Sequence, residues 1–442
     1  MSRAWDCVVV GAGPAGSRVA ELFSKQGYSV LLLDPKAPWE KPCGGGLTAA
    51  ALRHTPELRE LTSQMVTIRE LLVVAPSGAS DVVPLRNPYE VVSRLSLSRW
   101  GLEGAQAAGA RFLPVAAQTV KRDPAGWCVT DSRGSEHWAH WLIAADGATS
   151  RLRGMLAPRL RPEFAPTRVA YPQFPSVSGR AVFAFLRTAD GYLWDFPRTG
   201  YHSVGIGVAP GTFARTPLDE AIAQYRLAEV GEHEPVEQRG AVIATSEWAS
   251  GRFRDLGTGD HALLGDAAGL ADPATGEGID YALRSATLAA RGFRPDCGFV
   301  RYPAAAREAF AAEMRRARLI RHWLYRPGLA DALVVRARRS PRWALVLMSL
   351  VDAINEHGSL RGALLRSVVS RVPDREMAEA ICECPDGPGA SAPVVRANAA
   401  TAARAPFAPT DATSIAAGRS ARTPVGSGPC FSNQGDEEVR SG

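Results

Sequence analysis

A glycine-rich turn between two apolar runs restricts the fold of this chain more than any other feature. The apolar residues 7–10 lead directly into Gly11-x-Gly13-x-x-Gly16, and a second apolar run, residues 31–33, ends in Asp34. This order is typical of a strand, a tight turn, a helix and a second, parallel strand. Gly11 permits the turn, Gly13 lets the backbone approach a pyrophosphate, and Gly16 lets the helix pack closely. Asp34 can accept hydrogen bonds from ribose hydroxyls, so the unit predicts a bound dinucleotide.

A second strand–turn–helix pattern distinguishes between dinucleotides. The apolar residues 261–264 precede Gly265-Asp266, and a glycine-rich stretch then leads through Gly278 to Ile279, where a helix is expected. In flavoproteins of the glutathione-reductase type, such an Asp contacts the ribitol chain and the helix start faces the isoalloxazine. The alternative is an Asp that only caps a helix. Because both patterns occur in this order in one chain, they favour FAD over NAD.

A third pattern has two interpretations. Asp146-Gly147 follows the apolar residues 141–144 and resembles the Asp-Gly motif of flavin monooxygenases and their relatives, but it also fits a capped helix N-terminus. Arg94, at the start of a helix that Ser96 is expected to cap, fits an Arg that points at the FAD phosphates. A surface Arg is the alternative for that position.

The composition argues against several classes of protein, namely nucleic-acid-binding, metal-binding and membrane-spanning proteins. The chain has 51 basic and 45 acidic residues and no basic patch interleaved with aromatic residues, so we expect no nucleic-acid partner. Its seven cysteines are scattered without zinc-site spacing, so we predict no metal site and a reducing compartment. No signal peptide precedes the first strand, and the longest apolar stretch, residues 343–354, is too short to span a bilayer. The expected location is therefore the cytoplasm.

The order of expected strands and helices predicts an α/β protein. A Rossmann-like FAD-binding domain is interleaved with an antiparallel-sheet substrate domain and followed by a helical region. Residues 111–121 are expected to form one strand, and the small and polar residues after 384 to form a disordered tail. The predicted segments are residues 1–66, 93–165 and 251–300 for FAD binding, 67–92 and 166–250 for the substrate sheet, 301–384 for the helices and 385–442 for the tail.

Two further motifs concern the substrate. Tyr192-x-Trp194-x-Phe196-Pro197 lies on an expected strand, where the two-residue period places its three aromatic side chains on one face. Aromatic residues on one face of a sheet most often belong to the core. Cys43-Gly44-Gly45-Gly46 follows the first dinucleotide unit, in a loop that must pass near the flavin. Together the two motifs favour a substrate pocket over a core.

With these motifs the chain resembles the geranylgeranyl reductase family of FAD-dependent enzymes, up to about residue 300 and more loosely to about residue 380. The resemblance implies that the Tyr-x-Trp-x-Phe-Pro strand lines a lipid cavity and that the Cys-x-Gly-Gly loop lies beside the isoalloxazine. It also implies reduction of isolated carbon–carbon double bonds in a prenyl chain, by hydride from N5 of the reduced flavin. Two departures are Asp34 in place of the commoner Glu, and the lack of an acidic residue in residues 95–98 after Arg94.

The residues expected to act follow from the motifs and from the resemblance. The expected catalytic residues are Cys43, Tyr192 and Trp194, and the expected substrate-binding residues are Tyr192, Trp194 and Phe196. Cys43 would either donate a proton to the reacting bond or only shape the pocket. The residues expected to bind FAD are Gly11, Gly13, Ala15, Gly16, Asp34, Lys36, Cys43, Gly44, Gly46, Arg94, Asp266, Gly278 and Ile279.

Alternative functions and several partners stay open on the sequence alone. Aromatic hydroxylases share both fingerprints but usually carry His where this chain has Gly269, and halogenases use a Lys in a region where this chain has none, between Lys41 and Lys121. A flavin-binding lipid carrier or redox sensor is the non-enzymatic alternative. The electron donor is NAD(P)H or a ferredoxin-like protein. The arginine-rich residues 315–342 indicate either contact with the inner face of a membrane or a solvated helix surface.

Overall fold

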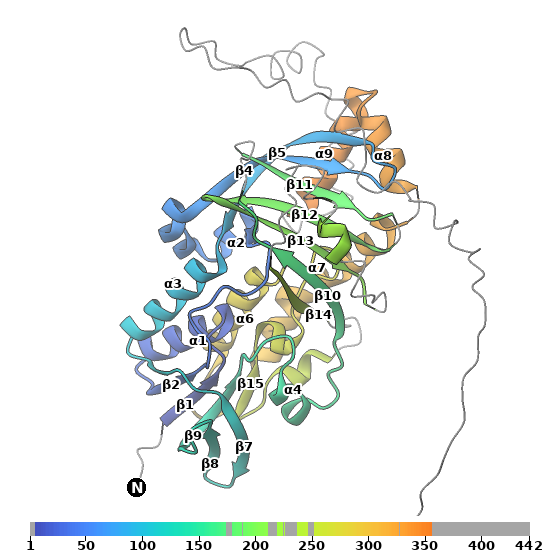
Figure 1. Ribbon diagram of the computed structural model, residues 1–442. Coiled ribbons are helices and arrows are strands. Elements are labelled where there is room, and N and C mark those ends of the chain that lie inside the picture. The colour runs from blue at the N-terminus through green and yellow to red at the C-terminus, as the bar shows by residue number, and fades with distance from the viewer. Residues whose placement is uncertain are drawn as a thin grey trace, which may run out of the picture. The chain divides into compact units, whose positions relative to one another are not determined.

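Two β-sheets and the helices packed on them form the part of the chain that the computed structural model describes (Figure 1). The described residues are 5–173, 179–187, 189–210, 219–223, 225, 237–245, 252–326 and 328–355. The predicted fold class, a parallel sheet combined with an antiparallel sheet and a helical region after them, is confirmed. The boundaries of the predicted segments stay predictions.

The first sheet places four positions of the sequence motifs at one edge. Its strands are β1 (Trp5–Val10), β2 (Val30–Leu33), β6 (Arg111–Leu113), β7 (Ala117–Asp123), β8 (Gly126–Asp131), β9 (Glu136–Ala144) and β15 (His261–Leu263). Among the described residues the order is β6-β2-β1-β9-β8-β7, with β15 also paired to β9. β1 pairs in parallel with β2 and β9, and β15 pairs in parallel with β9. Because parallel strands end at the same edge, Gly11, Asp34, Asp146 and Asp266 follow neighbouring strand ends.

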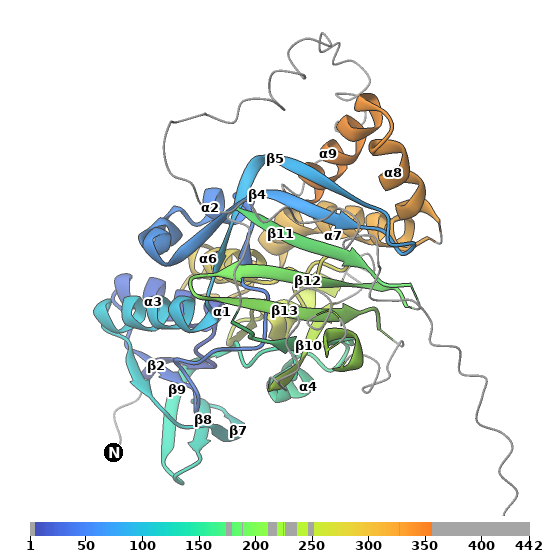
Figure 2. The ribbon, with the colours of Figure 1, turned by 45° about the horizontal axis from the view of Figure 1, so that its top comes forward.

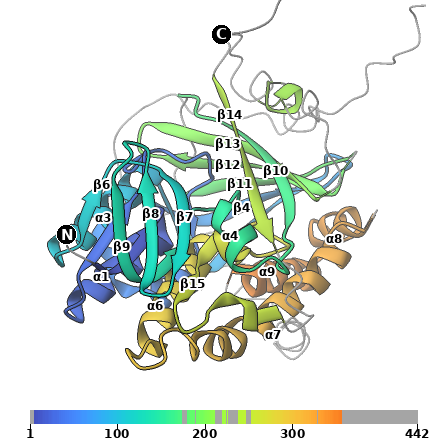
Figure 3. The same cartoon turned by 90° about the horizontal axis from the view of Figure 1, so that it is seen from below.

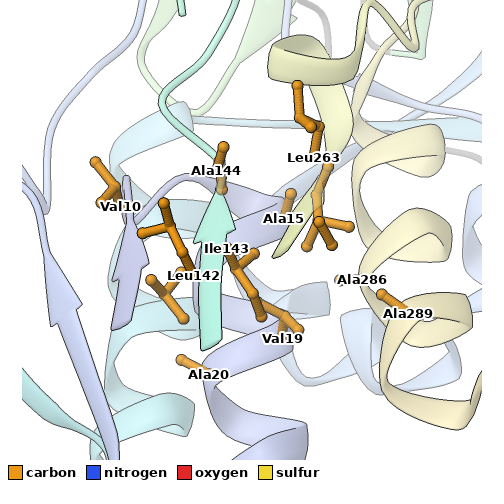
Figure 4. Close-up of a cluster of buried hydrophobic side chains, with 14 of the residues drawn as sticks. Val10, Ala15, Val19, Ala20, Leu142, Ile143, Ala144, Leu263, Ala286 and Ala289 are labelled. Atoms are coloured by element: carbon orange, nitrogen blue, oxygen red, sulfur yellow. The ribbon is translucent and has the colours of Figure 1, made fainter. Parts of the chain in front are cut away.

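Small side chains let two helices approach this sheet closely. The helices are α1 (Pro14–Lys25) and α6 (Ile279–Gly292), and their alanines lie against the aliphatic residues of the strands (Figure 4). This packing fixes the N-terminus of α1 at the strand edge where the glycine-rich turn lies. The buried residues of this contact include Val10, Ala15, Val19, Ala20, Leu142, Ile143, Ala144, Leu263, Ala286 and Ala289.

The second sheet holds the aromatic strand at its centre. Its strands are β3 (Gly46–Leu47), β4 (Met65–Val74), β5 (Ser80–Val92), β10 (Glu163–Ala170), β11 (Arg180–Phe185), β12 (Gly191–Arg198), β13 (Tyr201–Val208) and β14 (Gln238–Thr245). Their order in the described part is β14-β10-β13-β12-β11-β4-β5-β3, and only β4 and β11 pair in parallel (Figures 2 and 3). On β13, Gly205 lies opposite Trp194, and a Cβ at Gly205 would overlap the indole ring. The glycine therefore makes room for the aromatic side chain.

The remaining helices lie around the two sheets. α3 (Arg94–Ala107) packs on α1, and α7 (Tyr302–Leu324) packs on α6. α8 (Leu329–Ala337) and α9 (Pro341–Asn355) pack against each other and against β5 (Figure 2). Their buried apolar side chains form one cluster with those of the second sheet, which brings α8 and α9 close to the aromatic strand. The shorter helices are α2 (Ala49–His54), η1 (Pro56–Gln64), α4 (Arg151–Leu156), η3 (Arg252–Leu256) and η4 (Gly265–Ala268), and the cluster includes Val73, Val83, Phe185, Ala330, Val334 and Leu347.

Two local expectations are wrong. Residues 111–121 form two strands, because β6 continues the parallel sheet beside β2 whereas β7 pairs with β8. Ser93, not Ser96, caps α3, since its Oγ accepts a hydrogen bond from the Ser96 amide at 2.9 Å. The predicted helical region is described up to Asn355. Its last part, residues 356–384, and the predicted tail, residues 385–442, lie outside the described residues.

Candidate active site

A cavity of about 1500 Å³ opens between the two sheets and is lined by every motif that the sequence analysis identified. Its lining begins at the turn between β1 and α1, passes the loop that contains Cys43 and the aromatic strand β12, and ends at α8 and α9. The dinucleotide motifs and the substrate motifs therefore face one continuous space, although they lie far apart in the sequence.

The three glycines of the first fingerprint have different roles. Gly11 has φ of 98°, which favours glycine, and a Cβ at Gly16 would overlap the carbonyl oxygen of Gly11. A Cβ at Gly13 would meet no protein atom within 4 Å. Gly11 and Gly16 thus serve the turn itself, while Gly13 leaves space on the cavity side. Since α1 begins there without a side-chain cap, its free N–H groups and this space fit a pyrophosphate.

Asp34 also supports the turn from within the protein. Its Oδ2 accepts a hydrogen bond from the Ala12 amide at 2.8 Å, and its Oδ1 accepts from the amides of Lys36 at 2.7 Å and Ala37 at 3.0 Å. Asp34 and Lys36 both line the cavity, and the Lys36 ammonium lies 5.0 Å from the centre of the Trp39 ring. The ribose contact predicted for Asp34 is therefore compatible with a second role in holding the glycine turn.

Asp266, at the second fingerprint, is part of a charged group that the sequence did not predict. Lys41 donates a hydrogen bond to its Oδ2 at 2.8 Å, from a position 225 residues away. Burial opposes ionisation of Asp266, but Lys41, Arg94 and Arg153 hold its pKa below the usual range. A Cβ at Gly278, the N-cap of α6, would lie 3.0 Å from Asp266 Oδ1. Asp266 and the start of α6 thus meet at the cavity, as expected for the flavin end of the site.

The structure supports the capping interpretation for Asp146. Its carboxylate accepts hydrogen bonds from the Ser150 hydroxyl at 2.6 Å and from the Arg151 amide at 2.9 Å, at the start of α4. Burial raises the pKa of Asp146. Arg153 of the same helix donates to the carbonyl oxygens of Ala148 at 2.8 Å and Ala267 at 3.1 Å. Asp146 therefore caps α4, and Arg153 ties that helix to the second fingerprint.

The loop that carries Cys43 is held by residues of the second sheet. The carbonyl oxygen of Cys43 accepts hydrogen bonds from Arg198 Nη2 at 2.8 Å and from the Ser203 hydroxyl at 3.0 Å. Arg198 Nη1 also donates to Glu40 at 2.8 Å, and Glu40 accepts the Arg94 amide at 3.0 Å. These contacts fix the loop between β12, β13 and the start of α3. Glu40, Arg198 and Ser203 were not predicted as site residues, because no sequence motif marks their partners.

The Cys43 thiol lies among cationic groups. Burial opposes ionisation, but Arg94, the Gly45 amide at 3.4 Å and Lys41 lower the pKa of the thiol below its usual value. The Arg94 guanidinium therefore acts on both Cys43 and Asp266 at the cavity, and its contact with the FAD phosphates stays a prediction. Its Nε is buried and has no hydrogen-bond partner among the described residues. Arg94 lines the cavity, so a polar group of a bound ligand could satisfy this donor.

The aromatic strand lines the cavity as predicted from its two-residue period. Tyr192 stacks on Phe183 with ring centres 4.1 Å apart, and its hydroxyl donates to the Thr275 carbonyl oxygen. Trp194 Nε1 donates to the Ser203 hydroxyl at 3.3 Å. A Cβ at Gly44 would lie 2.9 Å from the Phe196 ring, so the Cys43 loop touches the aromatic face directly. The two substrate motifs are thus brought together.

The far end of the cavity is apolar and was not predicted. Strands β4 and β11 form one wall, and helices α7, α8 and α9 form the other. The sequence pattern shows that these helices are amphipathic, but it does not show which surface their apolar faces cover. The lining residues at this end are Leu71, Val73, Phe183, Phe185, Leu324, Ala330, Leu333, Val334, Leu347, Leu350 and Val351.

Solved structures share this fold. A geranylgeranyl bacteriochlorophyll reductase-like protein from Thermoplasma acidophilum has a TM-score of 0.57 and 20% identity, covering 85% of this chain and 99% of its own. The flavin-dependent brominase Bmp2 has a TM-score of 0.60 and 15% identity, covering 86% of this chain and 100% of its own. Because reductases and halogenases share the fold, these structures show the architecture alone.

Sequence relatives distinguish between these enzyme classes. A menaquinone reductase of Mycobacterium tuberculosis is 34% identical over 320 residues, which cover 64% of this chain and 75% of the relative. A geranylgeranyl diphosphate reductase of Rhodobacter capsulatus is 29% identical, covering 63% and 72%. A digeranylgeranylglycerophospholipid reductase of Methanopyrus kandleri is 30% identical, covering 63% and 77%. No family model matches the chain. Given this similarity, the glycine fingerprints and the Cys43 loop, the chain belongs to the geranylgeranyl reductase family of FAD-dependent oxidoreductases.

Proposed function

We propose that this enzyme reduces isolated carbon–carbon double bonds in the prenyl chain of a lipid or isoprenoid. The observation that carries the proposal is the continuous cavity, which joins a dinucleotide site to a long apolar end through Cys43 and the aromatic strand. The relatives named as prenyl-lipid reductases support the same substrate class. An extended apolar chain would bury most of its surface in such a cavity.

The residues of the dinucleotide end fit FAD. Gly13 and the start of α1 would hold the pyrophosphate, Asp34 the ribose, and Asp266 with Lys41 the ribitol side of the flavin. When bound and reduced, FAD supplies a hydride for the double bond. The apolar lining would exclude water from this space and orient the prenyl chain against the cofactor.

The aromatic strand and Cys43 would act on the prenyl chain. Tyr192, Trp194 and Phe196 offer flat apolar area that fixes the chain, and burial keeps the pKa of the Tyr192 phenol well above its usual value, so the phenol stays protonated. Cys43 lies where the loop meets these rings. Arg94, the Gly45 amide and Lys41 lower the pKa of its thiol, and the glycine loop around it would shape the pocket at the reacting bond.

An anaerobic reoxidation experiment tests the proposed reaction. The enzyme with FAD is reduced with dithionite and mixed with geranylgeranyl lipids, while the flavin spectrum and the product mass are followed. We expect the oxidised flavin spectrum to return and the product to gain two hydrogens per reduced bond. Product formation only in the presence of oxygen would indicate a hydroxylase or halogenase, and no reoxidation by any prenyl compound would contradict the proposal.

The electron donor is proposed to be NAD(P)H or a ferredoxin-like protein that binds transiently. Within the described residues, the glycine fingerprint at Gly11 is the one already assigned to FAD, so a nicotinamide would bind without a Rossmann unit of its own. Stopped-flow reduction of the flavin by NADPH, NADH and a reduced ferredoxin separates these donors. Reduction by none of them at a rate that matches turnover would reject both.

We further propose that α7 and its neighbours touch an anionic membrane surface, which would supply the lipid. None of the helices in the described ranges is long and apolar enough to cross a membrane. Leu319 and Trp323 on α7 are 60% and 51% exposed, and the Arg326 guanidinium lies 4.0 Å from the Trp323 ring. Apolar and cationic side chains in this arrangement favour an anionic interface. Flotation with anionic and neutral liposomes, comparing wild type with Trp323→Ser, tests this contact; equal flotation of the two would reject it.

A further inference from the structure

We infer that Glu277 is the acid that protonates the double bond, and that Asp280 and His54 return the proton to it from solvent. The inference rests on the proposed alkene reduction. Glu277 belongs to the second glycine-rich motif, and its half-buried side chain lines the cavity. Neither the fingerprints nor the resemblance assigned it a role.

The turn that carries Glu277 is held firmly in the cavity wall. Asp272 Oδ1 accepts hydrogen bonds from the Ala274 amide at 2.7 Å and the Thr275 amide at 2.9 Å, and the Asp272 amide donates to the Glu277 carbonyl oxygen at 2.8 Å. The Tyr192 hydroxyl donates to the carbonyl oxygen of Thr275. The aromatic strand that would fix the prenyl chain therefore also positions the turn that carries Glu277. The substrate and the Glu277 carboxyl would thus be held by the same strand.

The surroundings of Glu277 favour its protonated form. Burial and then the carboxylates of Asp280 and Asp272 raise its pKa well above the usual range. The Thr48 hydroxyl, which donates to Glu277 Oε1 at 3.1 Å from the start of α2, and Arg284 of α6 act in the opposite direction but are outweighed. A neutral carboxyl in a site that excludes water can donate a proton at neutral pH.

Asp280, whose charge acts on Glu277, pairs with a histidine that is partly exposed to solvent. Asp280 lies three residues after Glu277, in the first turn of α6, and is fully buried. Its carboxylate contacts His54 Nδ1 at 3.1 Å and Arg284 Nη1 at 3.3 Å, while Arg284 also pairs with Glu313 of α7 at 2.8 Å. The His54 side chain is 37% exposed. The imidazole therefore reaches both water and the buried Asp280 carboxylate, which places it on the proposed path of the proton.

The step balances in atoms and charge. The Glu277 O–H bond breaks and its proton forms a C–H bond at one carbon of the alkene, while the other carbon receives the hydride that reduced FAD supplies. The alkene is reduced and the flavin is oxidised. Glu277 is left as a carboxylate, and a proton taken up at His54 restores it. One proton from solvent is consumed for each double bond.

Infrared difference spectroscopy on the full chain tests the protonated state without any turnover. The carbonyl stretch of a protonated carboxyl, which shifts in D₂O, is expected at pH 7 in the wild type and is expected to be lost in Glu277→Gln. Glu90→Gln is the matched control, because Glu90 also accepts a Thr hydroxyl, that of Thr67 at 2.9 Å, but does not line the cavity. An unchanged band in Glu277→Gln would overturn the inference even if the enzyme reduces prenyl lipids.

Kinetics then test the two roles separately. Glu277→Gln is expected to slow a single turnover of the pre-reduced enzyme by about 100-fold or more, with partial recovery in Glu277→Asp. His54→Ala is expected to leave the first turnover unchanged, to slow repeated turnovers and to recover with added imidazole. Wild-type single-turnover rates in Glu277→Gln would reject Glu277 as the acid, and a slow first turnover in His54→Ala would reject the return path. Absence of reaction in the wild type would instead contradict the proposed function.

Discussion

Arg198, the last residue of the aromatic strand, donates a hydrogen bond from Nη2 to the carbonyl oxygen of Cys43 at 2.8 Å. The same guanidinium pairs with Glu40 at 2.8 Å and lies over the rings of Tyr171 and Tyr201. The Arg side chain is nearly fully buried. One residue therefore couples the two substrate motifs, and the position of Cys43 depends on it.

We expect Arg198→Ala to lower the free energy of unfolding by about 3 kcal/mol, because Glu40 is left without its buried partner. Arg198→Lys keeps the charge opposite Glu40 but loses the forked contacts with the Cys43 loop, so it is expected to retain more stability than activity. Urea denaturation and single-turnover kinetics measure the two effects. If both variants lost activity only in proportion to the folded fraction, the positioning role of Arg198 would be wrong.

Alkylation of Cys43 should report its charged surroundings. Arg94 and Lys41 favour the thiolate of Cys43. Its rate of reaction with iodoacetamide should therefore begin to rise at a lower pH than the rate for a free cysteine. Arg94→Met should move this profile to higher pH. Mass spectrometry identifies the labelled site, and the half-buried Cys297 serves as the reference thiol of the same chain. A profile that Arg94→Met leaves in place would show that the guanidinium does not act on Cys43.

Two glycine substitutions should separate ligand binding from folding. Gly13→Ala adds a methyl group that meets no protein atom within 4 Å, so we expect the apoprotein to keep its melting temperature while FAD binds about tenfold or more weakly. Gly16→Ala would overlap the Gly11 carbonyl oxygen and should unfold or strongly destabilise the apoprotein. Thermal melts and quenching of FAD fluorescence measure the two properties. Equal FAD affinity in Gly13→Ala and wild type would mean that the pyrophosphate lies elsewhere.

Filling the apolar end of the cavity should alter the preference for chain length. Leu333 of α8 lines this end, and Leu333→Trp would occupy space that a geranylgeranyl chain needs but a geranyl chain does not. We expect kcat/KM to fall by about tenfold or more for the long substrate and to change little for the short one. Leu319→Trp, at a position that is 60% exposed on α7, is the control. An equal fall in kcat/KM for both substrates would mean that the prenyl chain does not bind against α8 and α9.

Local patterns were sufficient for the elements of the site that lie within one segment. The glycine-rich turn, the Asp at the second strand end and the alternation of Tyr192, Trp194 and Phe196 depend on backbone geometry over a few residues, so the sequence by itself determined them. That the glycine-rich turn and this Asp meet at one edge of the sheet also follows from the parallel pairing of their strands. The prediction at Ser96 failed because Ser93 and Ser96 are equally suitable caps in the sequence. The prediction for residues 111–121 failed because the pairing partners, β2 for β6 and β8 for β7, divide this segment into two strands.

The tertiary structure alone decided which charged side chains lie beside these motifs and which helices line the cavity. Lys41 meets Asp266 across 225 residues, Arg198 meets Cys43 across 155, and His54 meets Asp280 across 226. None of these pairs has a periodic signature, because their contacts depend on the relative placement of two sheets and not on the spacing of residues along a helix or strand. The same holds for α8 and α9, whose apolar faces have a helical pattern in sequence but acquire a cavity to cover only when the second sheet is in place.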